Sequence, residues 1–155
     1  MTTDMKLTSI RNFVAIDERI GTAGQPTREQ FALIAEAGYS CVINLAMPDH
    51  RESIHDEGTL VTALGMSYIH LPVPFDAPTP EQVRRFCDIM DALAGEKVFI
   101  HCIMNYRVSA FLYLYFKYWR GYGEAEARSP MFEQWQPDPV WQALMAWDAG
   151  MLEKR

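Results

Sequence analysis

Short apolar runs alternate with amphipathic segments along most of the chain. The runs at 41–45, 68–73 and 97–101 have the length of buried strands and carry β-branched residues. Amphipathic segments that predict helices lie at 28–37, 53–64 and 81–93, and a long apolar segment at 107–119 predicts a further helix. Strands that alternate with helices in this way predict an α/β fold with a single, largely parallel sheet flanked by helices on both faces.

Helix boundary residues support these elements. Thr27 is expected to be the N-cap of the first helix, and Thr79 with Pro80 is expected to begin the third. The segment 74–80 contains three prolines, so it is expected to be a loop. The chain beyond residue 121 is expected to form further helices, divided by Pro130, Pro137 and Pro139.

Composition limits the classes of protein that fit. The chain has 155 residues, 49% of them hydrophobic, so we expect a single domain over 1–155. Its formal net charge of -6 argues against nucleic acid as a partner, although a small cationic pocket would still bind one phosphate. Three cysteines without regular spacing favour a reducing cytoplasm over a disulfide framework. Because no apolar stretch reaches membrane-spanning length, we expect a soluble cytoplasmic protein without membrane contact.

The stretch VFIHCIMNYRVS joins the last predicted strand to the long apolar helix. Cys102 follows the carboxyl end of that strand, where open α/β sheets bind ligands, and Arg107 lies in the first helical turn. A helix N-terminus and a guanidinium both favour a thiolate, and both bind tetrahedral oxyanions. We therefore expect Cys102 to be a nucleophile beside an anion site formed by Arg107 and loop amides. Cys41 and Cys87 are expected to be core residues.

The motif HisCys-x-x-Asn-x-Arg-x-Ser resembles the signature of the cysteine-dependent protein tyrosine and dual-specificity phosphatases. The stretches GQPT, VINL and YIHLPV, at 24–27, 42–45 and 68–73, are similar more specifically to a bacterial phosphatase-like domain family that also occurs fused in beta-lactamase-hydrolase-like proteins. The resemblance covers roughly residues 10 to 120. It implies a tyrosine/dual-specificity-phosphatase-like fold, a cysteinyl-phosphate intermediate, no cofactor, and a phosphorylated small molecule or phosphoprotein as substrate.

The loop is one residue shorter than in that signature. Five residues usually separate the cysteine from the arginine, whereas four do so here, and Val108 occupies the usual position of the arginine. A tighter loop predicts either fewer amides directed at a phosphate or a smaller cavity. Asn105 is expected to replace a loop glycine, because asparagine tolerates left-handed backbone angles. The residues expected to surround the substrate are Ile103, Met104, Asn105, Tyr106, Val108 and Ser109, with His101 orienting the loop.

The resemblance also implies a general acid supplied by a mobile loop. Asp76 lies in the comparable stretch and is the first candidate, with a solvated turn aspartate as the alternative. Asp49 is the second candidate, because loops that follow parallel strands share one rim of the sheet. His50 and Arg51 beside it are expected to contact the substrate. The histidines have no metal-ligand spacing, so no metal is expected.

Two further patterns concern packing. The segment 111–119 is apolar nearly all round, which predicts central burial, with a partner-binding surface as the alternative. Trp135, Trp141 and Trp147 are expected to hold the C-terminal helices against the core.

Three functions fit these observations. The first is a phosphatase that acts through a cysteinyl-phosphate. The second is a rhodanese-like sulfurtransferase with a persulfide on Cys102, since rhodanese-like enzymes have an active loop of similarly short length. The third is a non-catalytic phosphate-binding or scaffold domain that has kept anion affinity and lost turnover. The sequence identifies neither the physiological substrate nor the oligomeric state.

Overall fold

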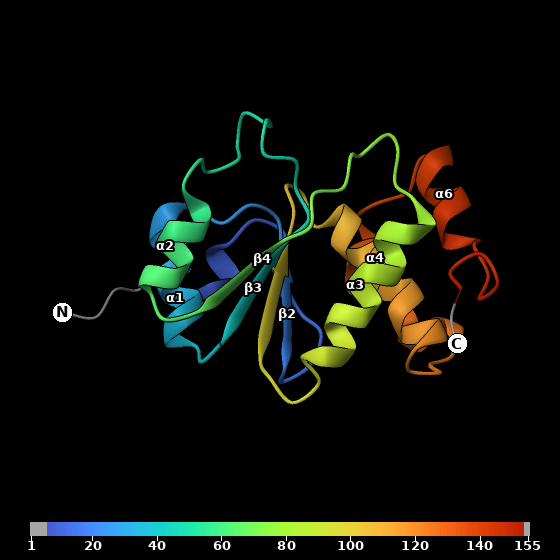
Figure 1. Ribbon diagram of the computed structural model, residues 1–155, viewed down its shortest axis with the longest axis horizontal. Coiled ribbons are helices and arrows are strands. Elements are labelled where there is room, and N and C mark those ends of the chain that lie inside the picture. The colour runs from blue at the N-terminus through green and yellow to red at the C-terminus, as the bar shows by residue number, and fades with distance from the viewer. Residues whose placement is uncertain (1–5, 154–155) are drawn as a thin grey trace.

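The computed structural model describes residues 6–153. Its sheet has five strands in the order β1-β2-β5-β3-β4. In that order their bounds are Val14–Ala15, Ile20–Ala23, Val98–His101, Cys41–Asn44 and Ser67–His70. The last four are parallel to one another, and β1 is antiparallel to β2. The α/β fold with a largely parallel sheet is therefore confirmed (Figure 1).

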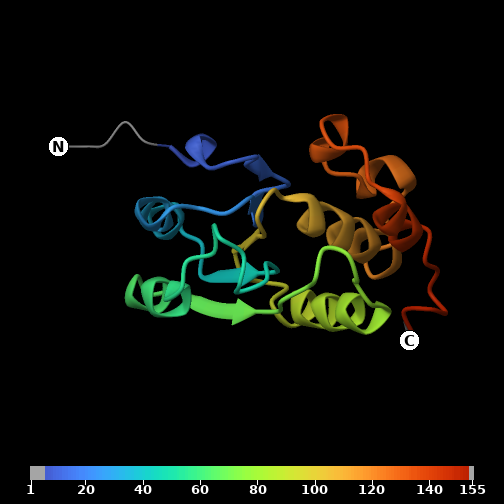
Figure 2. The same ribbon diagram turned by 90° about the horizontal axis from the view of Figure 1, so that it is seen from above.

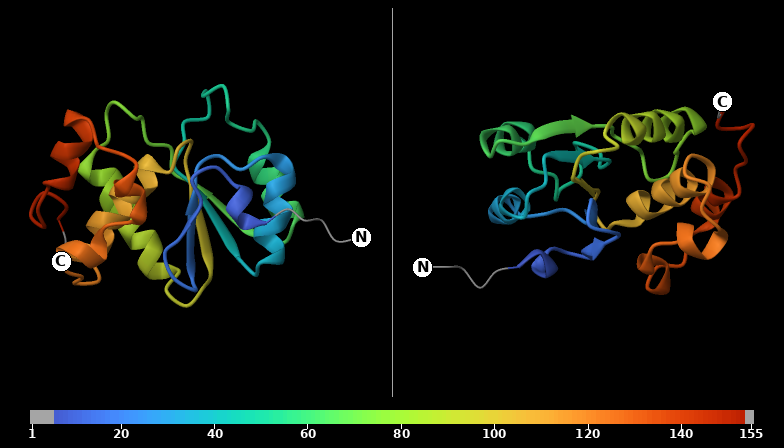
Figure 3. Two further views of the ribbon diagram at one scale, coloured as in Figure 1. Left: turned by 180° about the vertical axis from the view of Figure 1, so that it is seen from behind. Right: turned by 90° about the horizontal axis from the view of Figure 1, so that it is seen from below.

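Helices cover both faces of the sheet (Figures 1 and 2). One face carries α1 (Arg28–Glu36) and α2 (Glu57–Ala63), and the other carries α3 (Pro80–Ala92) and α4 (Tyr106–Tyr118). The shorter elements are η1 (Leu7–Ser9), α5 (Glu124–Ala127), η2 (Pro130–Glu133) and α6 (Pro139–Met145). The last three of these contact α4 and lie outside it, away from the sheet (Figure 3).

The strands divide the core by alternation of their side chains. Val42 and Phe99 are register partners and pack on the α1 and α2 side. Their neighbours Ile43 and Ile100 are also partners and pack on the α3 and α4 side. Successive side chains of a strand point to opposite faces. Both strands therefore need apolar residues at every position, which explains why these runs are continuous in the sequence.

The central burial expected over 111–119 is confirmed for 111–116, whereas 117–119 are half-buried. Residues 107–116 of α4 are all buried, so this helix lies centrally between α3 and the C-terminal elements. Trp141 is completely buried, Trp135 is nearly so, and Trp147 packs against the same cluster. Cys41 and Cys87 are buried core residues, as expected.

Two predicted elements were too long. The helix expected over 53–64 begins only at Glu57, because Ser53 closes a turn on the His50 carbonyl and donates its hydroxyl to the Met47 carbonyl. The strand expected over 68–73 ends at His70. The amides of Leu71 and Val73 still donate to the Asn44 and Leu45 carbonyls at 2.9 and 3.0 Å. Pro72 lies between them on the outer edge of the sheet, where its missing amide proton costs no ladder hydrogen bond.

Sequence analysis missed both N-terminal strands. β2 contains three small residues after Ile20, and such a run carries little β-propensity. It is nevertheless completely buried beside β5. Gly21 allows this position, because a Cβ there would collide with the hydroxyl of Tyr39. No helix within the described part of the chain is both long and apolar enough to cross a membrane.

The carboxyl ends of the parallel strands are level with one another. His101 at the end of β5 pairs with Ala23 of β2 on one side and with Asn44 of β3 on the other. Cys102, the next residue, therefore emerges at the centre of this edge of the sheet. The loop that leads from Cys102 into α4 lies between the loops that follow β2 and β3, which can hold it from both sides.

Candidate active site

The carbonyl groups of the loop after β5 have hydrogen-bond partners that lie outside α4. The Ile103 carbonyl accepts a hydrogen bond from the Gln25 amide at 3.0 Å, and the Met104 carbonyl accepts one from Asn12 Nδ2 at 2.9 Å. The carbonyl of Cys102 lies 3.0 Å from Nδ1 of His101. In a trans peptide the next amide points opposite to the carbonyl. The amides of residues 103–105 are thereby turned away from these partners.

These amides are joined by those of the first helical turn. Among the residues that the structure describes, no acceptor is found for any backbone N–H from 103 to 108. The first amides of a helix have no partner within the helix, and successive free amides form a concave site for an anion. The short loop therefore retains a run of donors beside Cys102.

Asn105 sets the shape of this loop. Its φ is 69° and its ψ is 10°, so the left-handed conformation expected for this residue is confirmed. Its side-chain amide donates to the Asn12 carbonyl at 2.8 Å and to the Thr22 hydroxyl at 3.0 Å. Ser109 donates its hydroxyl to the Asn105 carbonyl at 2.7 Å. Asn105 and Ser109 thus brace the loop from behind.

Close approach of another segment also constrains the loop. A Cβ added to Gly24 would overlap the Ile103 carbonyl oxygen and lie 3.1 Å from the carbonyl carbon. Glycine at this position lets the segment after β2 reach the loop and donate the Gln25 amide to it. The GQPT stretch therefore has a structural role in supporting Cys102.

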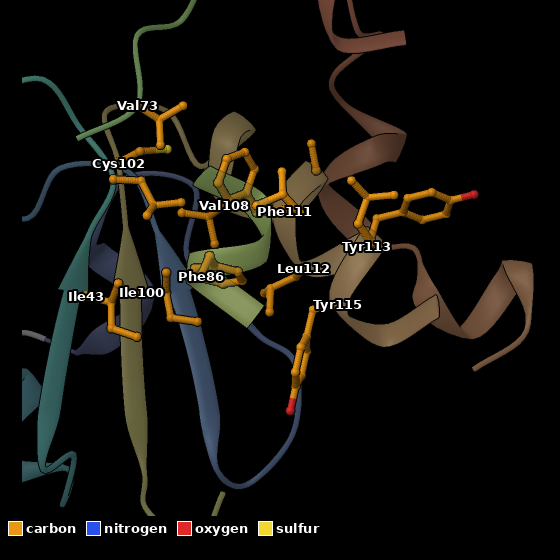
Figure 4. Packing of buried hydrophobic residues seen from close by; sticks show 14 of the residues in the cluster. Ile43, Val73, Phe86, Ile100, Cys102, Val108, Phe111, Leu112, Tyr113 and Tyr115 are labelled. Carbon is orange, nitrogen blue, oxygen red and sulfur yellow. The ribbon is translucent and has the colours of Figure 1, made fainter. Parts of the chain in front are cut away.

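Cys102 and Arg107 face the same cavity, whose volume is about 340 Å³. Its lining residues are His50, Phe75, Cys102, Ile103, Met104, Tyr106 and Arg107. Cys102 itself is completely buried and lies beside Val73 at the upper end of the core cluster (Figure 4). The remaining wall is mostly apolar, with His50 as a polar exception at the exposed side.

Arg107 is only 6% exposed, although it carries a permanent charge. Its Nη1 donates to the Val73 carbonyl at 2.8 Å, and its guanidinium lies 5.7 Å from the centre of the Phe75 ring. The buried Nε has no hydrogen-bond partner among the described residues. Because Nε and Nη2 form the second edge of the guanidinium, this edge is the one that can hold two oxygens of an anion.

Aromatic residues from the C-terminal part support the walls of the cavity. The ring of Tyr106 stacks on Trp135 at a centroid distance of 4.6 Å. Phe75 packs against Trp141 at 5.4 Å, and Trp141 Nε1 donates to the Phe75 carbonyl at 2.8 Å. The segment 130–145 therefore holds in place two of the residues that line the cavity.

The structure does not bring all of the expected site residues to the cavity. Ile103, Met104 and Tyr106 line it with Cys102 and Arg107. His101, Asn105, Val108 and Ser109 are buried behind the loop or in the core. Asp76 and Asp49 are exposed and outside the lining, but each is the sequence neighbour of a lining residue, Phe75 and His50 respectively. Arg51 is exposed and does not line the cavity.

Sequence reasoning missed Glu57 and Phe75. Glu57 is a buried carboxylate bonded to His101 Nε2 at 2.6 Å and to Gln25 Nε2 at 2.8 Å. A glutamate in the first turn of a helix is a common surface residue, so no local signal indicates this burial. Phe75 lies in a proline-rich loop, and an aromatic residue in such a loop was the one weak signal that it could line a binding site. Within the described residues, no group of three or more His, Cys, Asp or Glu side chains is placed to hold a metal.

Comparisons with known proteins found one matching family model and several solved structures of similar fold. A family model described as DSP-PTPase phosphatase fused to NAD+ kinase matches residues 12–131. The crystal structure of a DUF442 protein from Shewanella putrefaciens CN-32 has a TM-score of 0.80 and 36% sequence identity, and the match covers 90% of this chain and 91% of that one. Pseudomonas aeruginosa TpbA, crystallised in complex with pTyr, has a TM-score of 0.72 at 16% identity over 99% of this chain and 93% of its own, which shows likeness of fold.

A curated relative supports the narrower resemblance seen in the sequence. The beta-lactamase hydrolase-like protein of Agrobacterium fabrum is 34% identical over 93 residues, which are 57% of this chain and 21% of that protein. The chain thus spans about a fifth of the length of this relative. The expected resemblance to a bacterial phosphatase-like family is confirmed. With more than half of its length matched by the family model, the chain belongs to the family of phosphatase domains described as DSP-PTPase phosphatase fused to NAD+ kinase.

Proposed function

We propose that the chain is a cysteine-dependent phosphatase that hydrolyses phosphate monoesters through a cysteinyl-phosphate on Cys102. One observation carries this proposal. The buried guanidinium of Arg107 faces the same cavity as Cys102, is anchored through Nη1, and keeps an Nε without a partner among the described residues. A buried cation with an unpaired N–H beside a cysteine suits a dianionic group that the cysteine can attack.

The first step transfers the phosphoryl group to the protein. Sγ of the Cys102 thiolate forms a bond to phosphorus while the bond from phosphorus to the ester oxygen breaks. Arg107 and the amides of 103–108 bind the three remaining oxygens, on which negative charge is spread. Asp76 gives its proton to the departing oxygen, so the leaving group departs as an alcohol or phenol.

The second step regenerates the thiolate. A water molecule attacks phosphorus and gives a proton to the Asp76 carboxylate, and the bond between sulfur and phosphorus breaks to release inorganic phosphate. Asp76 is exposed and directly follows Phe75, which lines the cavity, and this position supports its role as the acid. Asp49 is the alternative acid from the opposite loop.

The substrate we propose is a phosphorylated small molecule or a phosphoprotein. Two proteins of similar fold are linked to phosphorylated compounds: TpbA was crystallised in complex with pTyr, and SIW14 of S. cerevisiae is a PP-IP phosphatase. The apolar wall of the cavity suits an ester whose carbon part is apolar or aromatic, because it would cover Phe75 and Tyr106.

The test is hydrolysis of 4-nitrophenyl phosphate by the purified full chain. We expect turnover that Cys102→Ser abolishes, and a mass increase of one phosphoryl group on Cys102 after acid quenching. A parallel assay with thiosulfate and cyanide tests the sulfurtransferase alternative. Thiocyanate formation without phosphate release would overturn the proposal, and inactivity in both assays would leave the non-catalytic alternative.

The two candidate acids are separated by their dependence on the leaving group. Asp76→Asn should slow release of a poor leaving group such as an alkyl alcohol far more than release of 4-nitrophenol, because only the former needs a proton in the transition state. Asp49→Asn is the matched control, since it removes the same charge from the opposite loop. The reverse pattern would assign the role to Asp49.

A further inference from the structure

The segment before β1 contacts the loop that carries Cys102, although the proposed reaction gives this segment no role. Asn12 lies in it and is half-buried. Its Nδ2 donates to the Met104 carbonyl at 2.9 Å, across 92 positions of the chain. In the opposite direction, the carbonyl of Asn12 accepts a hydrogen bond from Asn105 Nδ2 at 2.8 Å. The two asparagines thus connect the N-terminal segment and the loop by a reciprocal pair of hydrogen bonds.

Both asparagines have a left-handed backbone, with φ of 52° at Asn12 and 69° at Asn105. Among the residues that the structure describes, Glu153 is the only other non-glycine residue with a positive φ. This conformation costs free energy in a residue with a side chain, and it persists only where the surroundings hold it. Two of the three such residues therefore meet at the loop beside Cys102, where the bonds between them hold both conformations in place.

The backbone on either side of Asn12 is attached to β2 or to the residue after it. The Arg11 carbonyl accepts a hydrogen bond from the Gly24 amide at 2.7 Å. Two residues beyond Asn12, the Val14 carbonyl accepts one from the Thr22 hydroxyl at 2.8 Å. Because these bonds fix the backbone of Asn12 to the sheet, its side chain can hold the loop rather than follow it.

The bond from Asn12 decides which way one peptide of the loop is turned. In a trans peptide the carbonyl and the next amide point in opposite directions. The bond to the Met104 carbonyl therefore sets the direction of the Asn105 amide, which has no acceptor among the described residues. If this peptide turned over, its carbonyl would point towards the cavity that Met104 lines with Cys102 and Arg107. A carbonyl oxygen there would repel an oxyanion, whereas an amide attracts one.

We propose that Asn12 is a positioning residue that keeps the amide of the Met104–Asn105 peptide turned towards the anion site and its carbonyl turned away. The inference rests on the proposed function, in which this site holds the phosphoryl oxygens of the substrate. Asn12 does not line the cavity, so it acts through the loop. Its removal should therefore lower the affinity for an oxyanion even in a chain that stays folded.

The test is calorimetric titration of the full chain and of Asn12→Gly with inorganic phosphate. Glycine adopts a positive φ without steric cost, so this variant removes the side chain and keeps the backbone conformation. The carbonyl of residue 12 still accepts the bond from Asn105. We expect the phosphate affinity to fall by about two- to tenfold, which corresponds to the loss of one neutral hydrogen bond. Equal affinities in the wild type and the variant would overturn the inference.

A matched control separates this effect from a general loosening of the N-terminal segment. Ser9 is an exposed residue of the same segment, and its hydroxyl donates to the Lys6 carbonyl at 2.6 Å. Ser9→Ala removes this bond without touching the loop, and urea denaturation records the stability of each variant. Ser9→Ala should leave the phosphate affinity unchanged. A fall equal to that in Asn12→Gly would assign the effect to loosening and would refute the positioning role.

A measurement on the wild type does not depend on any variant folding. In ¹⁵N–¹H spectra, added phosphate should move the amide proton of Asn105 downfield, because this N–H then donates to an oxyanion. The shift should be much smaller in Asn12→Gly, and its absence in the wild type would contradict the proposal.

The titrations need no turnover, so they are independent of the phosphatase assay. A chain that binds phosphate through the Asn105 amide and hydrolyses no ester would refute the proposed function alone. An active chain whose phosphate affinity is unchanged in Asn12→Gly would refute only the role of Asn12.

Discussion

Replacing Arg107 by lysine tests the anion site most directly. Lysine keeps the positive charge and much of the length, but it has one nitrogen in place of a planar fork. In the structure Nη1 of Arg107 donates to the Val73 carbonyl at 2.8 Å, while the buried Nε has no hydrogen-bond partner among the described residues. A lysine ammonium that bonds the Val73 carbonyl has no second edge for an oxyanion.

The size of the effect follows from the bonds that are lost. Hydrogen bonds to charged groups contribute about 1.5–3 kcal/mol each. Losing one of the two bonds in the fork, with the general attraction of the charge retained, should weaken oxyanion binding by about ten- to a hundredfold, since 1.4 kcal/mol is a factor of about ten. The free energy of unfolding should fall by only about 1 kcal/mol, because the core around Arg107 is kept.

Protection of Cys102 from alkylation by inorganic phosphate measures this affinity. The wild type and Arg107→Lys are titrated with phosphate at constant ionic strength, and urea denaturation records the stability of each. Arg85→Lys is the matched control, because Arg85 is an exposed residue of α3 that pairs with Glu81. It should change neither affinity nor stability. Unchanged phosphate affinity in Arg107→Lys would refute the role of the guanidinium and with it the phosphatase interpretation of the loop.

Three further predictions test the surroundings of the site. Gly24→Ala should lower phosphate affinity and cost about 1–3 kcal/mol of stability, because its Cβ would overlap the Ile103 carbonyl oxygen; equal titration and denaturation curves would contradict this. Trp141→Phe keeps a ring but removes the hydrogen bond to the Phe75 carbonyl, so the free energy of unfolding measured in urea should fall by about 1 kcal/mol. The KM should rise, and an unchanged KM would show that Phe75 does not help to bind the substrate. Burial and, to a smaller extent, Glu96 raise the pKa of Cys41 to about 11, so iodoacetamide at pH 7.5 should label the active-site cysteine first, and equal labelling would remove the reason to consider that residue a nucleophile.

Local patterns in the sequence determined the main elements of the sheet and its covering helices. Strands buried on both faces, such as β3 and β5, need apolar residues at every position, and the capping residues Thr27 and Thr79 mark helix starts by their own hydrogen bonds. The spacing of Cys102 and Arg107 also belongs to the sequence. Because a strand end leads directly into a helix there, the two residues had to lie at one edge of the sheet.

Tertiary structure decided which distant groups meet that loop. Glu57 reaches His101 across 44 residues, and Arg107 is anchored on the carbonyl of a residue 34 positions earlier. β2, whose small residues carry little local preference, is placed beside β5 by the space that Gly21 leaves for Tyr39. Such contacts depend on how crossovers bring separate segments together and on which side chains exclude water. A linear pattern records neither distance nor burial, so the bond between Glu57 and His101 and the unpaired Nε of Arg107 were visible only in the folded chain.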